Sequence, residues 1–198
     1  IYTAADARYT GRVTVPVLWD RERATIVNNE SSEILRMLNA EFIALADASV
    51  DLYPESLRAE IDEINAFVYP KVNNGVYRCG FAATQEAYNE AFEALFEMLD
   101  QLEVLLASRR YLAGDRRTEA DWRLFTTLIR FDPVYVGHFK CNLRRIVDYP
   151  NLWAYTRELY QLDGVRETVD FDQIKRHYYM THLVLNPSGI VPNGPSID

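Results

Sequence analysis

The chain has 198 residues, of which 48% are hydrophobic and 25% charged, with a formal net charge of −8 and a sequence pI near 5.0. These values are ordinary for a globular protein of one or two domains. Nucleic-acid-binding proteins carry basic surfaces, so an acidic chain predicts no nucleic-acid partner. The apolar runs are far shorter than the roughly 18–20 residues of a membrane span, so no membrane partner is expected.

The cysteines and histidines predict neither a disulfide framework nor a metal site. Two cysteines, Cys79 and Cys141, are too few for a framework. The first residues lack a signal-peptide pattern, so a reducing, cytoplasmic location is expected. His177 and His182 are five positions apart, one more than the helical step that would stack them for a metal.

The first predicted elements are two strands. The apolar run over residues 13–19 predicts a strand that ends at Trp19. Pro16 lies inside this run, and a proline in a sheet belongs at an edge, a strand start or a bulge. Residues 20–23 are all charged and predict a turn, and residues 25–27 predict a second strand. So short a connection makes the two strands antiparallel.

An amphipathic helix is predicted to follow, with Asn29 as its N-cap. Its apolar face is expected to consist of Ile34, Leu35 and Leu38. Glu30 and Ser31 stand at its start, where free backbone amides and a hydroxyl can receive a carboxylate. A hairpin and one helix bury too little surface for a domain, so this segment is predicted to be the end of a larger α/β unit.

From about residue 54 onward, apolar residues recur with the period of an α-helix. Pro54 suits a first helical turn. Apolar residues then recur at steps of three and four, at Leu57, Ile61, Ile64, Val68 and Val72. Thr84 is predicted to cap a long helix, whose apolar stripe comprises Tyr88, Ala91, Leu95, Leu99, Leu102 and Leu106. Residues 111–115 are expected to form a turn.

The next predicted helix begins with a capping box. Thr118 is the expected N-cap, and Asp121 is placed to bond back to its amide. The helix is apolar on more than one side, so it is predicted to be central and buried. Asp132-Pro133 should end or bend it. Further helices are predicted from Pro150-Asn151 and near residues 172–182, followed by a coil tail.

These motifs together resemble a glutathione transferase. Val15-Pro16 precedes a strand, Glu30-Ser31 opens a helix, and Thr118 caps a central helix. Five longer phrases closely resemble the glutathionyl-hydroquinone reductases, the Xi-class glutathione transferases: VTVPVLWD, TIVNNESSEILRMLN, TEADWRLFTTLIRFDPVYVGHFKCN, YPNLWAYTRELYQ and IKRHYY. The resemblance covers nearly the whole chain.

The resemblance implies a fold that is α+β at the N-terminus and then all-α. Residues 1–45 would be the C-terminal part, the ββα end, of a thioredoxin-like glutathione-binding domain. Residues 46–185 would be the all-helical C-terminal domain, and residues 186–198 a coil tail. Members of the family suggest a homodimer built largely through the helical domains.

The resemblance also implies a chemistry. Family members reduce glutathionyl-hydroquinones with a cysteine thiolate in a Cys-Pro-Trp-Ala-like motif, and a second glutathione resolves the mixed disulfide. This chain contains no such motif, and Cys79 and Cys141 lie in its helical part. The catalytic cysteine is therefore expected upstream of Ile1, and the chain alone is expected to show no reductase turnover.

Residue roles follow from the matching motifs. Val15 would bind the cysteinyl backbone of glutathione, with Pro16 holding that geometry through a cis peptide bond. Ser31 and the helix amides would take the γ-glutamyl carboxylate, and Glu30 the ammonium group. No metal is implied.

The hydroquinone would be lined by tyrosines. Tyr135 matches one family tyrosine, and Tyr178 or Tyr179 matches another. A protonated phenol can donate to a leaving phenolate. His138 and His177 are interpreted as structural.

The pair Arg144-Arg145 could be an anion patch, although a solvated or salt-bridged pair is the preferred interpretation. Two other classes of protein stay open. A conjugating transferase would need a Ser or Tyr activator near the N-terminus, and Tyr2 is too close to the first strand to suit. A non-catalytic transferase-like interaction module is the other.

Overall fold

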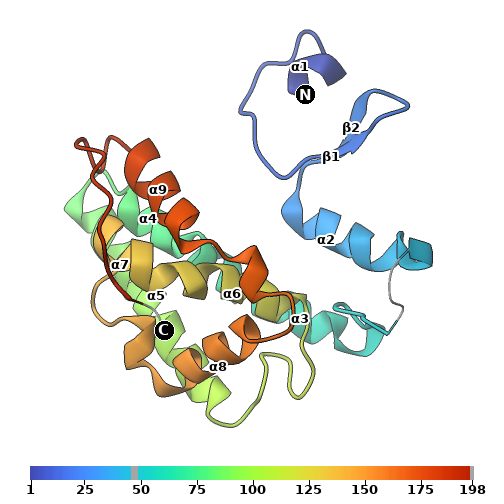
Figure 1. Cartoon of the computed structure of the whole chain (residues 1–198). Coiled ribbons are helices and arrows are strands. Elements are labelled where there is room, and N and C mark those ends of the chain that lie inside the picture. Colours follow the sequence, from blue (N-terminus) through green and yellow to red (C-terminus); the bar gives the residue numbers. More distant parts are fainter. Residues whose placement is uncertain (46–48, 197–198) are drawn as a thin grey trace. The chain divides into compact units, whose positions relative to one another are not determined.

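In the computed structural model, residues 1–45 and 49–196 are described, and they belong to two compact units, Ile1–Glu55 and Ser56–Asp198 (Figure 1). The domain boundary predicted between residues 45 and 46 adjoins residues 46–48, which lie outside the described residues. The fold class expected from the sequence is confirmed: a small two-stranded sheet comes first and helices follow.

The first unit contains one antiparallel strand pair. Its elements are α1 (Tyr2–Ala5), β1 (Leu18–Asp20), β2 (Thr25–Asn28), α2 (Ser31–Ala40) and a 3₁₀ turn at Ile43–Leu45. Trp19 pairs with Ile26, which confirms the antiparallel prediction. The predicted strand over 13–19 was too long, because β1 begins only at Leu18. Pro16 has no N–H to donate to a ladder, which explains the late start.

The start of α2 corrects one prediction. Its N-cap is Glu30, not Asn29. The Glu30 carboxylate accepts the Ser32 backbone N–H at 3.3 Å, whereas the Asn29 amide donates to the Tyr2 hydroxyl at 3.0 Å. Of the predicted apolar face, Ile34 is buried, while Leu35 and Leu38 are exposed.

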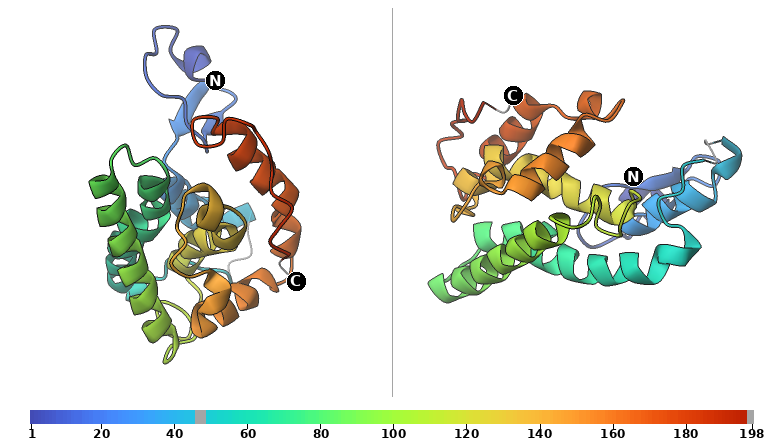
Figure 2. Two further views of the ribbon diagram at one scale, coloured as in Figure 1. Left: turned by 90° about the vertical axis from the view of Figure 1, so that its left-hand side faces the viewer. Right: turned by 90° about the horizontal axis from the view of Figure 1, so that it is seen from below.

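The second unit is helical. Its helices are α3 (Arg58–Val68), α4 (Gly75–Gly80), α5 (Gln85–Leu106), α6 (Glu119–Arg130), α7 (Val136–His138), α8 (Pro150–Tyr160) and α9 (Phe171–Thr181). Both views in Figure 2 place α6 amid the other helices of this unit. The Thr84 hydroxyl accepts the Ala87 N–H at 3.2 Å, so the predicted cap of α5 is confirmed. Pro150 occupies the first turn of α8, as expected.

Asp121 joins α6 to two neighbouring segments. Its buried carboxylate accepts the Thr118 N–H at 2.7 Å, which confirms the predicted capping box. The same carboxylate accepts the Leu112 N–H at 2.9 Å and the Tyr155 hydroxyl at 2.8 Å. One side chain therefore ties the turn before α6, the helix itself and α8 together.

The chain bends after α6, as Asp132-Pro133 predicted. A π turn over Phe131–Tyr135 replaces regular helix and leads into α7. The Asp132 carboxylate accepts the Ile146 N–H at 2.6 Å and so holds a distant loop. The tail over 186–196 contains neither helix nor strand, as predicted for these described residues. No described helix has the length and apolar character needed to cross a membrane.

Candidate functional site

The predicted glutathione residues lie on two segments of the first unit. The Val15-Pro16 peptide bond is cis, and the Val15 side chain is 89% exposed. Ser31 is the first residue of α2, where backbone N–H groups lack helical partners and the helix dipole favours an anion. Glu30 places a carboxylate beside these amides. An exposed main chain and an open helix start are the groups that an amino-acid-like ligand needs.

The Tyr2 hydroxyl connects these two segments. It donates to the Thr14 carbonyl at 2.9 Å, and it lies 3.0 Å from the Thr14 hydroxyl. The Asn29 amide donates to it at 3.0 Å. Thr14 and Asn29 directly precede the two predicted ligand-binding pairs. Sequence reasoning weighed Tyr2 only as a thiol activator and missed this connection, because no local pattern links positions 27 residues apart.

Two of the predicted tyrosines meet in the second unit. The hydroxyls of Tyr135 and Tyr178 are 2.9 Å apart, and both side chains are buried. The Tyr77 hydroxyl lies 2.6 Å from that of Tyr178. Tyr77 is 39% exposed, which makes it the most exposed of the three tyrosines. Sequence reasoning missed Tyr77, which is 101 positions from Tyr178.

Burial sets the electrostatics of this chain of hydroxyls. It raises the pKa of Tyr135 and of Tyr178 well above the usual phenol range, so both stay protonated at neutral pH. The hydrogen bond with Tyr135 counters part of this rise in the pKa of Tyr178, whereas the hydrogen bond with Tyr77 adds to it. Either oxygen of each pair can be the donor, so the three hydroxyls form one continuous hydrogen-bonded chain.

Tyr179 lies apart from this chain. Its side chain is only partly buried, and burial raises its pKa. The ring centroids of Tyr179 and His138 are 4.6 Å apart. His138 Nε2 lies 3.3 Å from His182 Nδ1, and burial lowers the pKa of both imidazoles. Tyr178, rather than Tyr179, is therefore the neighbour of Tyr135.

The two cysteines are poor candidates for a nucleophile. Cys79 and Cys141 are both buried. The Cys141 thiol donates to the backbone carbonyls of Val76 and Phe139, at 4.0 Å and 3.9 Å. The neighbouring Cys79 thiol and burial raise the pKa of Cys141, whereas the same interaction lowers the pKa of Cys79. A nucleophilic thiolate needs access and an electropositive setting. Within residues 1–45 and 49–196, no group of three or more His, Cys, Asp or Glu is arranged to hold a metal ion.

The arginine pair is engaged in ion pairs. Arg144 Nη2 lies 2.6 Å and 2.8 Å from the two carboxylate oxygens of Asp100. Arg145 Nη2 lies 2.7 Å from Asp148. The preferred interpretation, a salt-bridged pair rather than an anion patch, is confirmed.

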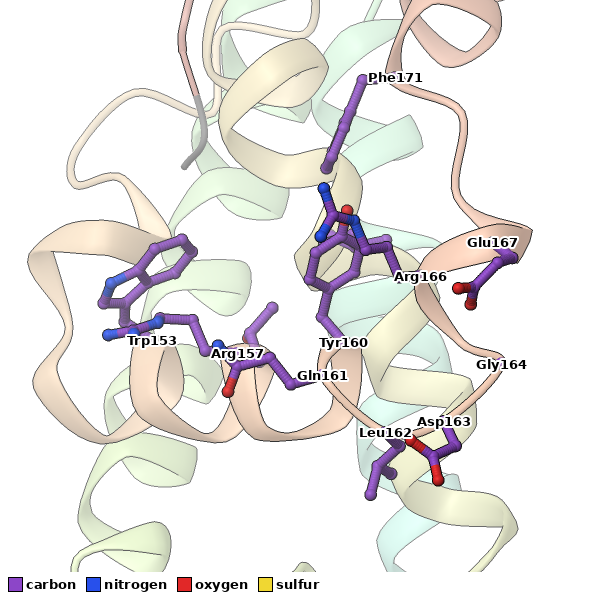
Figure 3. A pocket seen from close by; sticks show the side chains of 12 residues that line it. Trp153, Arg157, Tyr160, Gln161, Leu162, Asp163, Gly164, Arg166, Glu167 and Phe171 are labelled. Carbon is purple, nitrogen blue, oxygen red and sulfur yellow. The ribbon is translucent and has the colours of Figure 1, made fainter.

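Two cavities in the second unit flank the loop between α8 and α9. The first has a volume of about 460 Å³ and is walled by Trp153, Tyr160 and Phe171 (Figure 3). The second, of about 620 Å³, includes Trp122 and Arg130 from α6. The predicted tyrosines line neither of these two cavities. Arg130, which lines the second cavity, carries a charge that offsets a small part of the burial-driven rise in the pKa of Tyr135 and Tyr178.

Comparison with known proteins places the chain among the glutathione transferases. The family model described as the C-terminal domain of glutathione S-transferase matches residues 85–158. The glutathionyl-hydroquinone reductase YqjG of Escherichia coli is 55% identical over 98% of the chain and 60% of its own length. PcpF of Sphingobium chlorophenolicum, also a glutathionyl-hydroquinone reductase, is 57% identical over 99% and 63%. The chain thus spans less than two thirds of these relatives.

Comparison with solved structures also places the chain among the glutathione transferases. The glutathione-bound structure of the Escherichia coli protein superposes with a TM-score of 0.97, over 100% of this chain and 64% of that one. Glutathione transferase Xi 1 of Trametes versicolor gives a TM-score of 0.95 at 53% identity, over 98% and 68%. The hairpin, the open start of α2 and the capped helical unit define a glutathione transferase. Within that class, the chain belongs to the glutathionyl-hydroquinone reductases, the Xi-class glutathione transferases, as the sequence phrases indicated.

Proposed function

We propose that the chain serves the glutathione-dependent reduction of glutathionyl-hydroquinones to hydroquinones. The observation that carries the proposal is the start of α2, where Glu30 caps the helix and Ser31 stands at its open first turn. Ser31 and the neighbouring amides hold the γ-glutamyl carboxylate, and Glu30 holds the ammonium group. The Glu30 carboxylate already accepts two bonds from Ser32, and its remaining lone pairs can take a ligand. The main chain of Val15 binds the cysteinyl backbone of glutathione, and Pro16 sets the conformation of the segment that contains Val15.

The nucleophile in this proposal is a cysteine thiolate supplied from outside residues 1–198. The thiolate attacks the glutathione sulfur of the substrate, the bond from that sulfur to the ring breaks, and the ring leaves as hydroquinone after taking up a proton. A second glutathione reduces the enzyme–glutathione disulfide and releases oxidised glutathione. The burial of both Cys79 and Cys141 supports this assignment. The 198-residue chain should therefore bind glutathione without turnover.

The tyrosine chain serves the phenolic substrate in this proposal. Tyr77 donates its phenol proton to a hydroquinone oxygen, and Tyr178 and Tyr135 hold the Tyr77 oxygen in place through the hydroxyl chain. Tyr179 packs beside them against α7. These assignments rest on the hydroxyl distances of 2.6 Å and 2.9 Å.

Glu30→Gln should weaken glutathione binding about tenfold. The amide oxygen can still accept from Ser32, so the helix cap is kept, whereas the charge that holds the ammonium group is lost. Isothermal titration of the 198-residue chain with glutathione measures the change.

Glu33→Gln is the matched control for this change. It removes the same charge from the first turn of α2, where Glu33 accepts a bond from Asn28. Affinity should stay within about twofold of the unsubstituted chain. Equal weakening by both substitutions would point to a general charge effect and would contradict the assigned role of Glu30.

Tyr77→Phe should lower kcat about tenfold, with little change in KM for glutathione, because it removes the phenol proton. The assay uses a glutathionyl-hydroquinone and a protein that includes the nucleophile. Tyr88→Phe is the control, because it also removes a hydroxyl from the same unit, one that donates to the Lys140 carbonyl at 2.7 Å. An unchanged kcat in Tyr77→Phe would exclude proton donation by this residue.

A further inference from the structure

The Tyr2 hydroxyl forms hydrogen bonds with two separate segments of the first unit. A phenol offers one donor and two acceptor sites. Here it donates to the Thr14 carbonyl at 2.9 Å and accepts from the Asn29 amide at 3.0 Å. The Thr14 hydroxyl and N–H lie at 3.0 Å and 3.3 Å. Tyr2 is 8% exposed, and its bonds to Thr14 and Asn29 are partly buried.

The two segments that Tyr2 joins are the two that carry the proposed glutathione groups. Thr14 is bonded to Val15, and Asn29 is bonded to Glu30. A ligand that spans both segments binds well only if their separation is fixed before it arrives, because ordering two loops on binding costs affinity. Without Tyr2, the direct bond between Asn29 and the Thr14 hydroxyl, at 3.4 Å, is the weaker connection that remains.

We propose that Tyr2 is a positioning residue for glutathione: its hydroxyl fixes the separation between the Val15 segment and the start of α2. This inference rests on the proposed function. It also explains why Tyr2 does not suit a thiol-activating role. Its proton is held by the Thr14 carbonyl and its lone pairs face Asn29 and Thr14, so its hydroxyl is occupied within the protein.

Tyr2→Phe tests the proposal, because it keeps the ring and its contact with Tyr9 while removing the hydroxyl. The dissociation constant of glutathione for the 198-residue chain should rise about five- to tenfold, as expected for the loss of one or two hydrogen bonds. Titration calorimetry measures this constant at a temperature where circular dichroism shows the variant fully folded. In a protein that includes the nucleophile, KM for glutathione should rise while kcat is retained.

Tyr9→Phe is the matched control. It removes a hydroxyl from the same segment, one that donates to the Arg12 carbonyl at 2.6 Å and has no bond to Thr14 or Asn29. Its glutathione affinity should stay within about twofold of the unsubstituted chain. Asn29→Ala should weaken binding, and adding it to Tyr2→Phe should have less than the multiplied effect, because both substitutions break the same bond.

The outcomes separate this inference from the proposed function. If the unsubstituted chain does not bind glutathione, the proposed function fails. If it binds, and Glu30→Gln weakens binding while Tyr2→Phe does not, the site stands and the positioning role is overturned. The positioning role would also be overturned if Tyr2→Phe and Tyr9→Phe lowered the glutathione affinity equally. The same holds if the loss of affinity in the double variant of Tyr2→Phe and Asn29→Ala equalled the product of the two single losses.

Discussion

Asp121→Ala is expected to lower the free energy of unfolding of the helical unit by about 4 kcal/mol. The substitution leaves the N–H groups of Thr118 and Leu112 and the hydroxyl of Tyr155 buried without their acceptor. Each unsatisfied buried donor costs about 1–3 kcal/mol, and the N-cap contribution is lost as well. Urea unfolding of the 198-residue chain, followed by far-ultraviolet circular dichroism, measures the change.

Asp121→Asn is the matched control. One carboxylate oxygen accepts from Leu112 and Tyr155, and the other accepts from the N–H and hydroxyl of Thr118. An amide keeps only one of these acceptors, so about half of the loss is expected. A loss below about 1 kcal/mol in Asp121→Ala would show that water or repacking satisfies the donors.

The same residue predicts a dependence of stability on pH. Burial raises the pKa of Asp121, so the native state holds this proton more tightly than the unfolded chain. The contribution of the group is therefore complete below the usual aspartate pKa and is lost as pH rises through the raised value. Asp121→Asn, which cannot titrate, should flatten this part of the curve of unfolding free energy against pH.

Gly80→Ala should destabilise the helical unit by about 3 kcal/mol. A Cβ at this position would lie 2.2 Å from Cδ1, 2.4 Å from Cγ and 2.9 Å from Cβ of Phe139. Phe139 is fully buried and stacks on Tyr135, so its ring can move only by displacing the side chains packed around it. Overpacking of a rigid core typically costs 1–3 kcal/mol, occasionally more. Thermal unfolding measures the loss.

Gly75→Ala separates this clash from the ordinary effect of alanine in a helix. Gly75 and Gly80 are the first and last residues of α4. A Cβ at Gly75 would meet its nearest neighbours at 3.7 Å, which is ordinary contact. Gly75→Ala should therefore be neutral or slightly stabilising. Comparable losses in the two variants would mean that α4, rather than its contact with Phe139, is sensitive.

The sequence was informative wherever structure depends on neighbouring residues. Thr84 and Thr118 were correctly predicted as caps, because a cap and its partner lie within one turn. Pro133 and Pro150 marked the bend after α6 and the start of α8 for the same reason. The interpretation of Arg145 as ion-paired was also confirmed, because its partner Asp148 is a near neighbour in the sequence.

Prediction failed where a distant side chain decides the outcome. Asn29 has the properties of an N-cap, but Tyr2, from the start of the chain, engages its amide and Glu30 becomes the cap. The first strand was predicted too long because hydrophobicity does not show where a ladder partner is missing. No local sequence pattern pointed to Tyr77, because its proposed role depends on a contact with Tyr178, which is 101 positions away in the sequence.

The hydrogen-bonded tyrosines have a consequence for how the surface of the helical unit responds to its interior. Hydroxyls in series polarise one another, so each bond strengthens the next. Tyr77, the partly exposed member of this chain, is linked through Tyr178 to Tyr135, which has almost no contact with water. The position of a partly exposed hydroxyl thus depends on core packing, and a change in the fit of Phe139 against Tyr135 would move this hydroxyl without altering any surface residue.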